Sequence, residues 1–111
     1  MRRTLATVIV VVTALAVALP ASAAVPTFRG TVGPGFTISM SKKPTKPGRI
    51  KVVVSDKATS HNFHLTGPGV NVRTSVPATG TKTFTITVKK GLYRFVCDPH
   101  ATSMRGSFRI S

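Results

Sequence analysis

Three side chains that bind soft metals lie close together near the end of the chain. The segment CDPHATSM, residues 97–104, places the thiol of Cys97, the imidazole of His100 and the thioether of Met104 within eight residues. Sulfur ligands combined with imidazole favour copper among the first-row transition metals. Pro99 restricts the backbone of the turn, so the His100 ring can return beside the sulfur. The segment predicts a copper site that still lacks one ligand, because a trigonal site of this type needs two histidines.

The second histidine can come from His61 or His64. In the candidate strand HNFHLT, side chains alternate between the two faces. His61 shares its face with Phe63 and Leu65, so it is expected to point toward the end of the core that Cys97 reaches. His64 is expected on the opposite, solvent-facing side. We therefore predict His61 as the fourth ligand, and a hydrogen-bonded core histidine is the alternative.

The remaining residues of this segment also have structural alternatives. A single buried cysteine in a β domain is most often a small hydrophobic side chain, and Met104 could fill a gap in the core. Met40, at the end of FTISM, is expected to have that packing role. Asp98 is expected to serve the turn after Cys97, as aspartate often does.

The first residues have the pattern of a secretory signal peptide. Arg2 and Arg3 precede the apolar run LATVIVVVTALAVAL, and Pro20 and the small residues ASAA follow it. The run is shorter than the roughly 20 residues that span a bilayer, which argues against a retained membrane anchor. We predict a signal peptide of residues 1–23 and a domain of residues 24–111 with no transmembrane segment. The mature protein is expected to be exported: extracellular, in the cell envelope or in the periplasm.

Export makes the single cysteine of the chain informative. Without the leader, 111 − 23 = 88 residues remain, and a domain of this size gains from a disulfide or a metal. Cys97 has no second cysteine in the chain to pair with, and a free thiol outside the cytoplasm is open to oxidation. Metal ligation would explain why the thiol is kept.

The rest of the domain has the pattern of short strands separated by turns. KTFTITV places Phe84, Ile86 and Val88 on one face and threonines on the other, which is typical of a half-buried strand. The other candidate strands are TFRGTV, FTISM, RIKVVVS, HNFHLT, VNVRT, LYRFVC and GSFRI. Turn signals rich in Gly and Pro separate them. The pattern predicts an antiparallel all-β sandwich or barrel of about seven to eight strands.

The charge of the domain limits its partners. Residues 24–111 contain 14 Lys and Arg, the 16 of the whole chain less Arg2 and Arg3, against two aspartates, for a formal charge of +12. Such a field attracts acidic proteins, anionic wall polymers or lipid headgroups. Nucleic acid is not expected, because the chain is exported and its aromatic residues form no stacking series among the basic ones. We expect the protein to be a monomer.

The sequence does not favour an enzyme. The two carboxylates, Asp56 and Asp98, lie 42 positions apart, so they offer no paired acid and base. A Cys–His nucleophile is the alternative, but the domain is short for a substrate cleft, and Asp98 follows the thiol on the same tight loop. No helix is expected after either GPG stretch, so no phosphate-binding loop is predicted.

Two separated motifs resemble those of a known family. SHNFHL resembles the His-Asn segment of plastocyanin-like and amicyanin-like blue copper proteins, and GLYRFVCDPHATSMRGSF resembles their closing segment, G-x-Y-x-F-x-C-x-P-H followed by M-x-G. All of residues 24–111 are similar to a cupredoxin. The resemblance implies a Greek-key β-sandwich holding one mononuclear type 1 copper. It implies His61, Cys97 and His100 as equatorial ligands and Met104 as the long axial one. It also implies that Asn62 ties the first histidine loop to the backbone beside the cysteine, in support of the site.

The ligand loop departs from the family patterns in one respect. Three residues separate His100 from Met104, whereas the plastocyanin pattern has four and the amicyanin pattern two. We expect this spacing to affect the axial distance and the redox potential more than the identity of the ligands.

The resemblance implies one-electron transfer between Cu(I) and Cu(II), with the exposed edge of His100 as the exit path. The basic surface would steer an acidic redox partner, or hold the protein at an anionic envelope surface. Two other functions stay open. One is an exported copper-binding protein that buffers or delivers the metal, whose ligands could be identical. The other is a metal-free basic sandwich that adheres to acidic envelope polymers.

Overall fold

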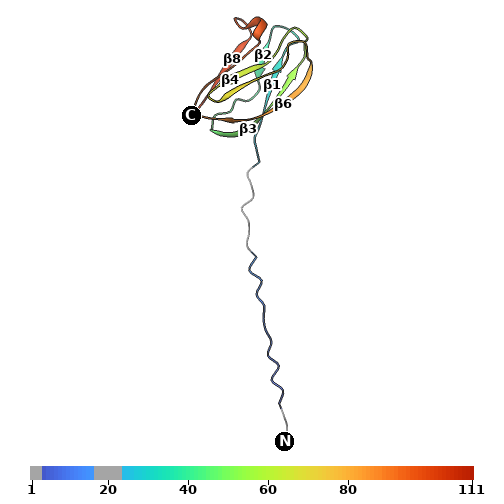
Figure 1. Ribbon diagram of the computed structural model, residues 1–111, viewed down its shortest axis with the longest axis vertical. Coiled ribbons are helices and arrows are strands. Elements are labelled where there is room, and N and C mark those ends of the chain that lie inside the picture. Colours follow the sequence, from blue (N-terminus) through green and yellow to red (C-terminus); the bar gives the residue numbers. More distant parts are fainter. Residues whose placement is uncertain (1–3, 17–23) are drawn as a thin grey trace.

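A computed structural model describes residues 4–16 and 24–111. Residues 4–16 contain no helix or strand, and the first strand begins at Thr27 (Figure 1). Residues 1–3 and 17–23, which include the predicted cleavage site, lie outside the described residues, so the leader and the domain boundary stay predictions. In the two described ranges, no helix is long and apolar enough to cross a membrane.

Eight strands of the described chain form two four-stranded sheets. The first sheet contains β1 (Thr27–Val32), β2 (Ile38–Met40), β3 (Gly48–Asp56) and β6 (Gly80–Val88). Its order is β2-β1-β3-β6, with β1 and β3 parallel and the other pairs antiparallel. The prediction of antiparallel pairing is therefore wrong for β1 and β3, because β2 pairs with the other edge of β1 and β3 then runs beside β1 in the same direction.

The second sheet is antiparallel throughout and has the order β5-β4-β7-β8. Its strands are β4 (His64–Gly67), β5 (Val70–Arg73), β7 (Gly91–Val96) and β8 (Arg105–Ile110). The chain crosses repeatedly between the sheets, as the two strand orders show. The predicted all-β, Greek-key sandwich of seven to eight strands is confirmed.

Each sheet buries one face, as the period-two pattern predicts. In β3, Ile50, Val52 and Val54 are buried, while Arg49 and Lys51 are exposed. Met40 at the end of β2 is also buried in the core, which is the packing role expected for it.

Two aromatic stacks lie in the core. The rings of Phe63 and Phe95 stack with centroids 5.5 Å apart, and those of Tyr93 and Phe108 stack with centroids 5.2 Å apart. Burying one such side chain contributes about 1.5–3 kcal/mol to folding. The stacks anchor β7, which ends at the residue before Cys97.

Several predicted strand boundaries differ from the structure, most of them by one or two residues. β2 begins at Ile38 instead of Phe36, and β4 begins at His64 instead of His61. Before β4, the backbone N–H groups of Asn62 and Phe63 donate to side-chain atoms instead of to a neighbouring strand. Because these N–H groups already have partners, the hydrogen bonds between β4 and its neighbouring strands cannot extend back to His61. His61 therefore lies in a loop, three residues before the strand that it was predicted to start.

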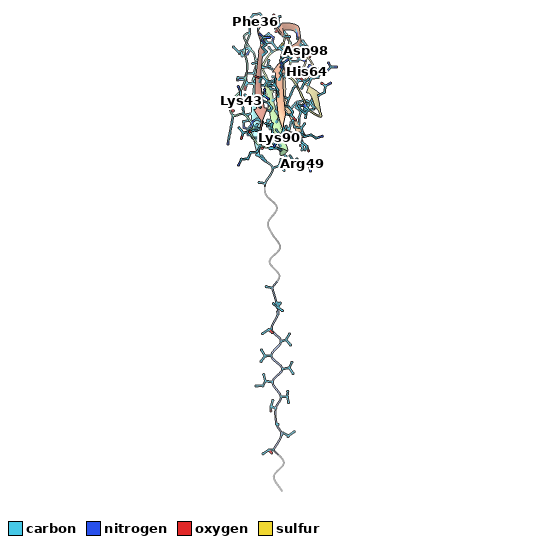
Figure 2. All side chains as sticks on the ribbon, turned by 90° about the vertical axis from the view of Figure 1, so that its left-hand side faces the viewer. Phe36, Lys43, Arg49, His64, Lys90 and Asp98 are labelled. Atoms are coloured by element: carbon cyan, nitrogen blue, oxygen red, sulfur yellow. The ribbon has the colours of Figure 1, made fainter. Side chains whose placement is uncertain are left out.

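Four loops lie at one end of the sandwich, which we call the metal end. They are the β1–β2, β3–β4, β5–β6 and β7–β8 loops, and the last contains the short 3₁₀ turn η1 (Asp98–His100). Figure 1 shows this turn, in orange, at the end of the domain away from the C-terminus. In Figure 2, Phe36 and Asp98 lie at the metal end, and Lys90 and Arg49 lie toward the opposite end.

Candidate metal centre

The donor atoms of His61, Cys97 and His100 converge at the metal end. The Cys97 Sγ lies 3.7 Å from the Nδ1 of His61 and 3.6 Å from the Nδ1 of His100. The two Nδ1 atoms are 3.1 Å apart. The structure thus brings together three of the four predicted ligands, from two loops that are 36 positions apart in the chain.

The size of this triangle suits a transition metal. Its corners are 3.1, 3.6 and 3.7 Å apart, so a point equidistant from them lies about 2 Å from each, near typical metal–nitrogen and metal–sulfur bond lengths. One sulfur and two imidazole nitrogens form a donor set that copper accepts well. The residues present therefore fit a mononuclear copper ion.

The side of the centre that holds the thiol is buried away from solvent. Cys97 has no exposed surface, and His61 and Asn62 are each 2% exposed. The backbone N–H of Asn62 points at the Cys97 Sγ from 3.5 Å. This N–H therefore places a hydrogen-bond donor beside the sulfur and helps to orient it as a metal ligand.

The Asn62 side chain holds the two ligand loops together. Its Oδ1 accepts a hydrogen bond from the backbone N–H of Asp98 at 2.7 Å. Its Nδ2 donates to the Asp98 Oδ2 at 2.7 Å and to the Thr74 carbonyl at 3.3 Å. The bond to the Asp98 N–H joins the first histidine loop to the backbone beside the cysteine, as the family resemblance implies. The Asp98 carboxylate is an additional partner. Because Asp98 follows Cys97 directly, Asn62 fixes the position of the sulfur relative to the histidine loop.

The ligand loop closes on itself through backbone hydrogen bonds. The N–H of Cys97 donates to the carbonyl of Met104 at 3.0 Å, which joins the two ends of the loop. The carbonyl of His100 accepts from the N–H groups of Ser103 and Met104, at 3.1 and 2.8 Å. The three-residue spacer therefore forms one compact turn. Met104 is 1% exposed and lies in the core cluster with Cys97, whereas its role as the axial ligand stays a prediction.

The β1–β2 loop covers the centre from the other side. The ring of Phe36 meets the His61 and His100 rings edge-on, with centroid distances of 5.4 and 5.0 Å. Phe36 is nevertheless 71% exposed. Behind it, Gly33 has a φ of +71°, and a Cβ at this position would lie 3.2 Å from the Cδ2 of His61.

A polar chain runs outward from the buried side. The Asp98 Oδ1 bonds to His64 Nδ1 at 2.8 Å, and His64 Nε2 bonds to Asn71 Oδ1 at 2.7 Å. Burial acts to raise the pKa of Asp98. The hydrogen bonds from His64 and Asn62 and the positive charges of His64 and Arg73 together outweigh burial and hold the pKa of Asp98 below its usual value.

His64 and Asp98 have more contacts than their sequence positions indicated. His64 lies on the outer face of β4, as predicted, and Asp98 lies in the turn, as predicted. Their hydrogen bond was not predicted, because it depends on the pairing of β4 with β7, in which His64 faces Val96. Phe36 was also missed, and the only available signal was the GPG turn before it.

The fold is shared with several solved protein structures. A dithionite-reduced auracyanin from the photosynthetic bacterium Roseiflexus castenholzii matches with a TM-score of 0.56 and 19% identity over 81% of this chain and 99% of its own. Reduced rusticyanin matches with a TM-score of 0.59 and 22% identity over 81% of this chain and 82% of its own. Rusticyanin from Thiobacillus ferrooxidans matches with a TM-score of 0.55 and 24% identity over 80% of this chain and 79% of its own. At these identities the likeness shows the fold alone. No curated protein sequence matches this chain.

The sequence itself matches a family model over most of its length. Residues 36–111 match the copper-binding proteins of the plastocyanin/azurin family. This range includes both ligand loops and every strand from β2 to β8. The chain therefore belongs to the plastocyanin/azurin family of copper-binding proteins, as its two motifs and its converging histidines and cysteine indicate.

Proposed function

We propose that the protein is an exported one-electron carrier and not an enzyme. We assign His61, Cys97 and His100 as the equatorial ligands of one type 1 copper, and Met104 as the axial ligand. The observation that supports the proposal best is the convergence of the three donor atoms between two loops that a buried amide holds together. When bound, copper would supply a one-electron couple between Cu(I) and Cu(II).

The surrounding residues keep the ligands in place. The Cys97 sulfur is held by its own loop, by the Asn62 N–H and by the dry core below it. His61 lies between Gly33 and the Phe36 ring, so its ring has little room to turn. A rigid site that suits both oxidation states reduces the reorganisation that accompanies electron transfer, because the environment is already organised.

His100 offers the route to a partner. It is half-buried, whereas His61 and Cys97 are buried. Its ring lies beside the exposed Phe36 at the metal end. An electron can therefore leave through a ligand that a partner protein approaches directly, without opening the core.

Export is the second part of the proposal. The basic and apolar pattern of residues 1–23 supports it. A ligated thiolate is protected from the oxidation that a free thiol would meet outside the cytoplasm.

A copper titration tests the ligand assignment. Residues 24–111 contain all eight strands and the whole described core, so they are expressed alone and titrated with Cu(II). We expect an intense visible thiolate-to-copper band that disappears on reduction and returns on oxidation. Cys97→Ser should abolish the band. Met104→Leu should shift the band or the potential, and Met40→Leu, the matched change at a buried core methionine, should leave both unchanged.

Two outcomes would contradict the proposal. A colourless protein, or a band that survives Cys97→Ser, would exclude the type 1 site. Transfer of copper to a recipient apoprotein, without reversible redox cycling, would instead indicate copper delivery.

A further inference from the structure

The outer face of the second sheet presents four exposed arginines. Arg73 lies on β5, Arg94 on β7, and Arg105 and Arg109 on β8. Each alternates with inward-facing neighbours, so all four point away from the core. We call this surface, made of Arg73, Arg94, Arg105 and Arg109, the arginine face.

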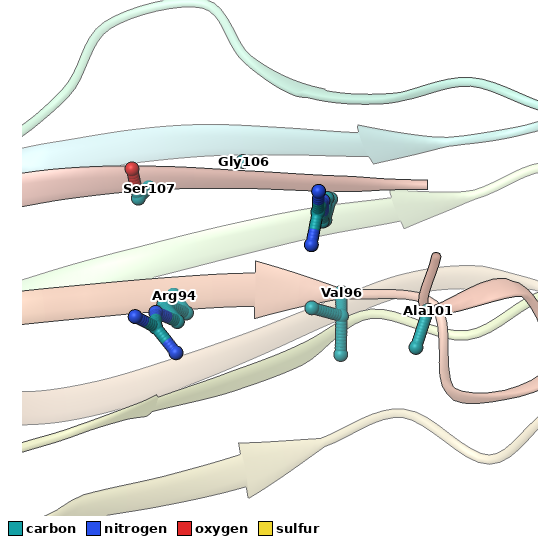
Figure 3. A pocket seen from close by; sticks show the side chains of 6 residues that line it. Arg94, Val96, Ala101, Gly106 and Ser107 are labelled. Carbon is teal, nitrogen blue, oxygen red and sulfur yellow. The ribbon is translucent and has the colours of Figure 1, made fainter. Parts of the chain in front are cut away.

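A hollow lies between two of these arginines. It has a volume of about 480 Å³ and is lined by Arg94, Val96, Ala101, Arg105, Gly106 and Ser107. Figure 3 shows Arg94, Val96 and Ala101 in a row along β7 and the loop that follows it, with Ser107 on the neighbouring strand. The register pairs Arg94 with Ser107 and Val96 with Arg105. Arg94 and Arg105 are therefore diagonal neighbours on one face, close enough for both to reach a single group.

The chain itself does not neutralise this hollow. It contains only two acidic residues, Asp56 and Asp98. Asp56 is buried and bonded to Ala58 and Thr74, and Asp98 is paired with His64. In the described part of the chain, neither Arg94 nor Arg105 forms an ion pair. Two guanidinium groups that lie close together without a carboxylate repel each other, and a bound anion would relieve that repulsion.

The chemistry of the hollow suits the carboxylates of a protein. Each guanidinium offers a planar fork of donors that matches a carboxylate in a bidentate fashion, and the Ser107 hydroxyl can add a hydrogen bond. Val96 and Ala101 give the same hollow an apolar wall, which can contact the methylene stem of a Glu or Asp side chain. Arginine combined with apolar contacts is characteristic of protein interfaces. Lys46, Lys89 and Lys90, by contrast, lie in turns at the opposite end of the domain.

The hollow also adjoins the metal centre. Val96, Ala101 and Arg105 directly precede or follow Cys97, His100 and Met104 in the chain. A partner seated on the arginine face therefore lies beside the ligand loop. We propose that the arginine face binds the carboxylate groups of an acidic partner protein, with Arg94, Arg105 and Ser107 as the central contact. This inference rests on the proposed electron-carrier function, since it identifies where the acidic partner docks.

A matched pair of double variants tests the proposal. Arg94→Gln/Arg105→Gln removes two charges from the hollow, and Arg29→Gln/Lys51→Gln removes two exposed charges from diagonal neighbours on β1 and β3 of the other sheet. The probe is a fluorescein-labelled oligoglutamate peptide, and its affinity for residues 24–111 is measured by anisotropy at low salt. We expect the first variant to weaken binding by about tenfold or more, and the second by no more than about threefold. Equal losses in the two variants would overturn the proposal, because they would show that only the net charge matters.

Vesicles containing phosphatidylglycerol separate a protein partner from a membrane surface. Vesicle binding should fall equally in the two double variants, because a charged surface responds to the total charge of the protein. If vesicle binding depended on Arg94 and Arg105 and peptide binding did not, the proposal would also be overturned.

The visible copper band is recorded for all samples. A protein that binds the peptide through Arg94 and Arg105 without a copper band would contradict the electron-carrier function and retain the docking site. A protein with the copper band, in which both double variants lose peptide affinity equally, would contradict the docking site and retain the electron-carrier function.

Discussion

The two sides of the metal centre are built differently. Around Cys97, the neighbouring groups are buried and joined by hydrogen bonds between 2.7 and 3.5 Å long. Around His100, the contacts are ring edges, and Phe36 is 71% exposed. The first side resists movement because each buried polar group would lose a partner if it shifted. The second side has no such penalty, so it can admit a metal or a partner.

One metal site must combine a fixed ligand geometry with access for a metal or a partner, and the two sides divide these properties between them. Stability and ligand geometry should depend on the hydrogen-bonded side, and rates of exchange should depend on the ring-edge side. Substitutions on the two sides should therefore change different measurements.

Replacing Asn62 with alanine should have the largest effect on stability. The change removes the acceptor of the Asp98 N–H, and it removes the donor to the Thr74 carbonyl and the Asp98 carboxylate. We expect the free energy of unfolding of the metal-free protein to fall by about 2–4 kcal/mol. Copper affinity should fall by about 10- to 100-fold, as for other residues that orient metal ligands. Urea denaturation and competition with a copper chelator measure the two effects.

Asn71→Ala is the matched control for this prediction. Asn71 is exposed and is bonded only to His64 among the side-chain contacts of the described chain. Its removal should cost less than about 1 kcal/mol. If the two substitutions had equal effects, the amide of Asn62 would not be the link between the loops.

Gly33→Ala should have an intermediate effect. A Cβ on Gly33 would lie 3.1 Å from the Ala58 Cβ and 3.2 Å from the His61 Cδ2, and the φ of +71° disfavours any side chain. We expect a loss of about 1–2 kcal/mol in unfolding free energy. The visible copper band should also shift, since the His61 ring must move.

Gly35→Ala provides the control within the same loop. A Cβ at Gly35 would have no heavy atom within 4 Å. Its unfolding free energy should change by less than about 0.5 kcal/mol, with an unaltered band. If Gly33→Ala changed neither the unfolding free energy nor the visible band, the β1–β2 loop would be easily displaced and would not hold His61 in place.

The strands and the ligand loop could be predicted because their signals are local. Period-two alternation identifies which face of β3 or β7 is buried without knowledge of its neighbours. Cys97 and His100 lie three residues apart, so one turn brings them together whatever surrounds it. The alternation correctly predicted that His61 is buried, although His61 lies in the loop before β4 and not in a strand.

The contacts that were missed depend on how separate segments pack. His64 meets Asp98 only because β4 pairs with β7 in one register, and a strand's own pattern contains no information on the register with its neighbour. Phe36 reaches the two histidine rings only because the β1–β2 loop folds over the end of the sandwich. An exposed aromatic residue after a turn has no sequence signal that distinguishes it from any other loop residue.

Phe36→Ala should have the smallest effect on stability and should act on rates instead. Because Phe36 is 71% exposed, its truncation loses little buried surface, and unfolding free energy should fall by less than about 1 kcal/mol. Removal of its ring uncovers the edges of the His61 and His100 rings. A chelator should then extract copper several times faster, as followed by the decay of the visible band. Thr37→Ala, a truncation at the next exposed position of the loop, should leave that rate unchanged. If Phe36→Ala instead destabilised the protein as much as Asn62→Ala, the contrast between the two sides of the centre would be wrong, because the exposed ring would then be structural.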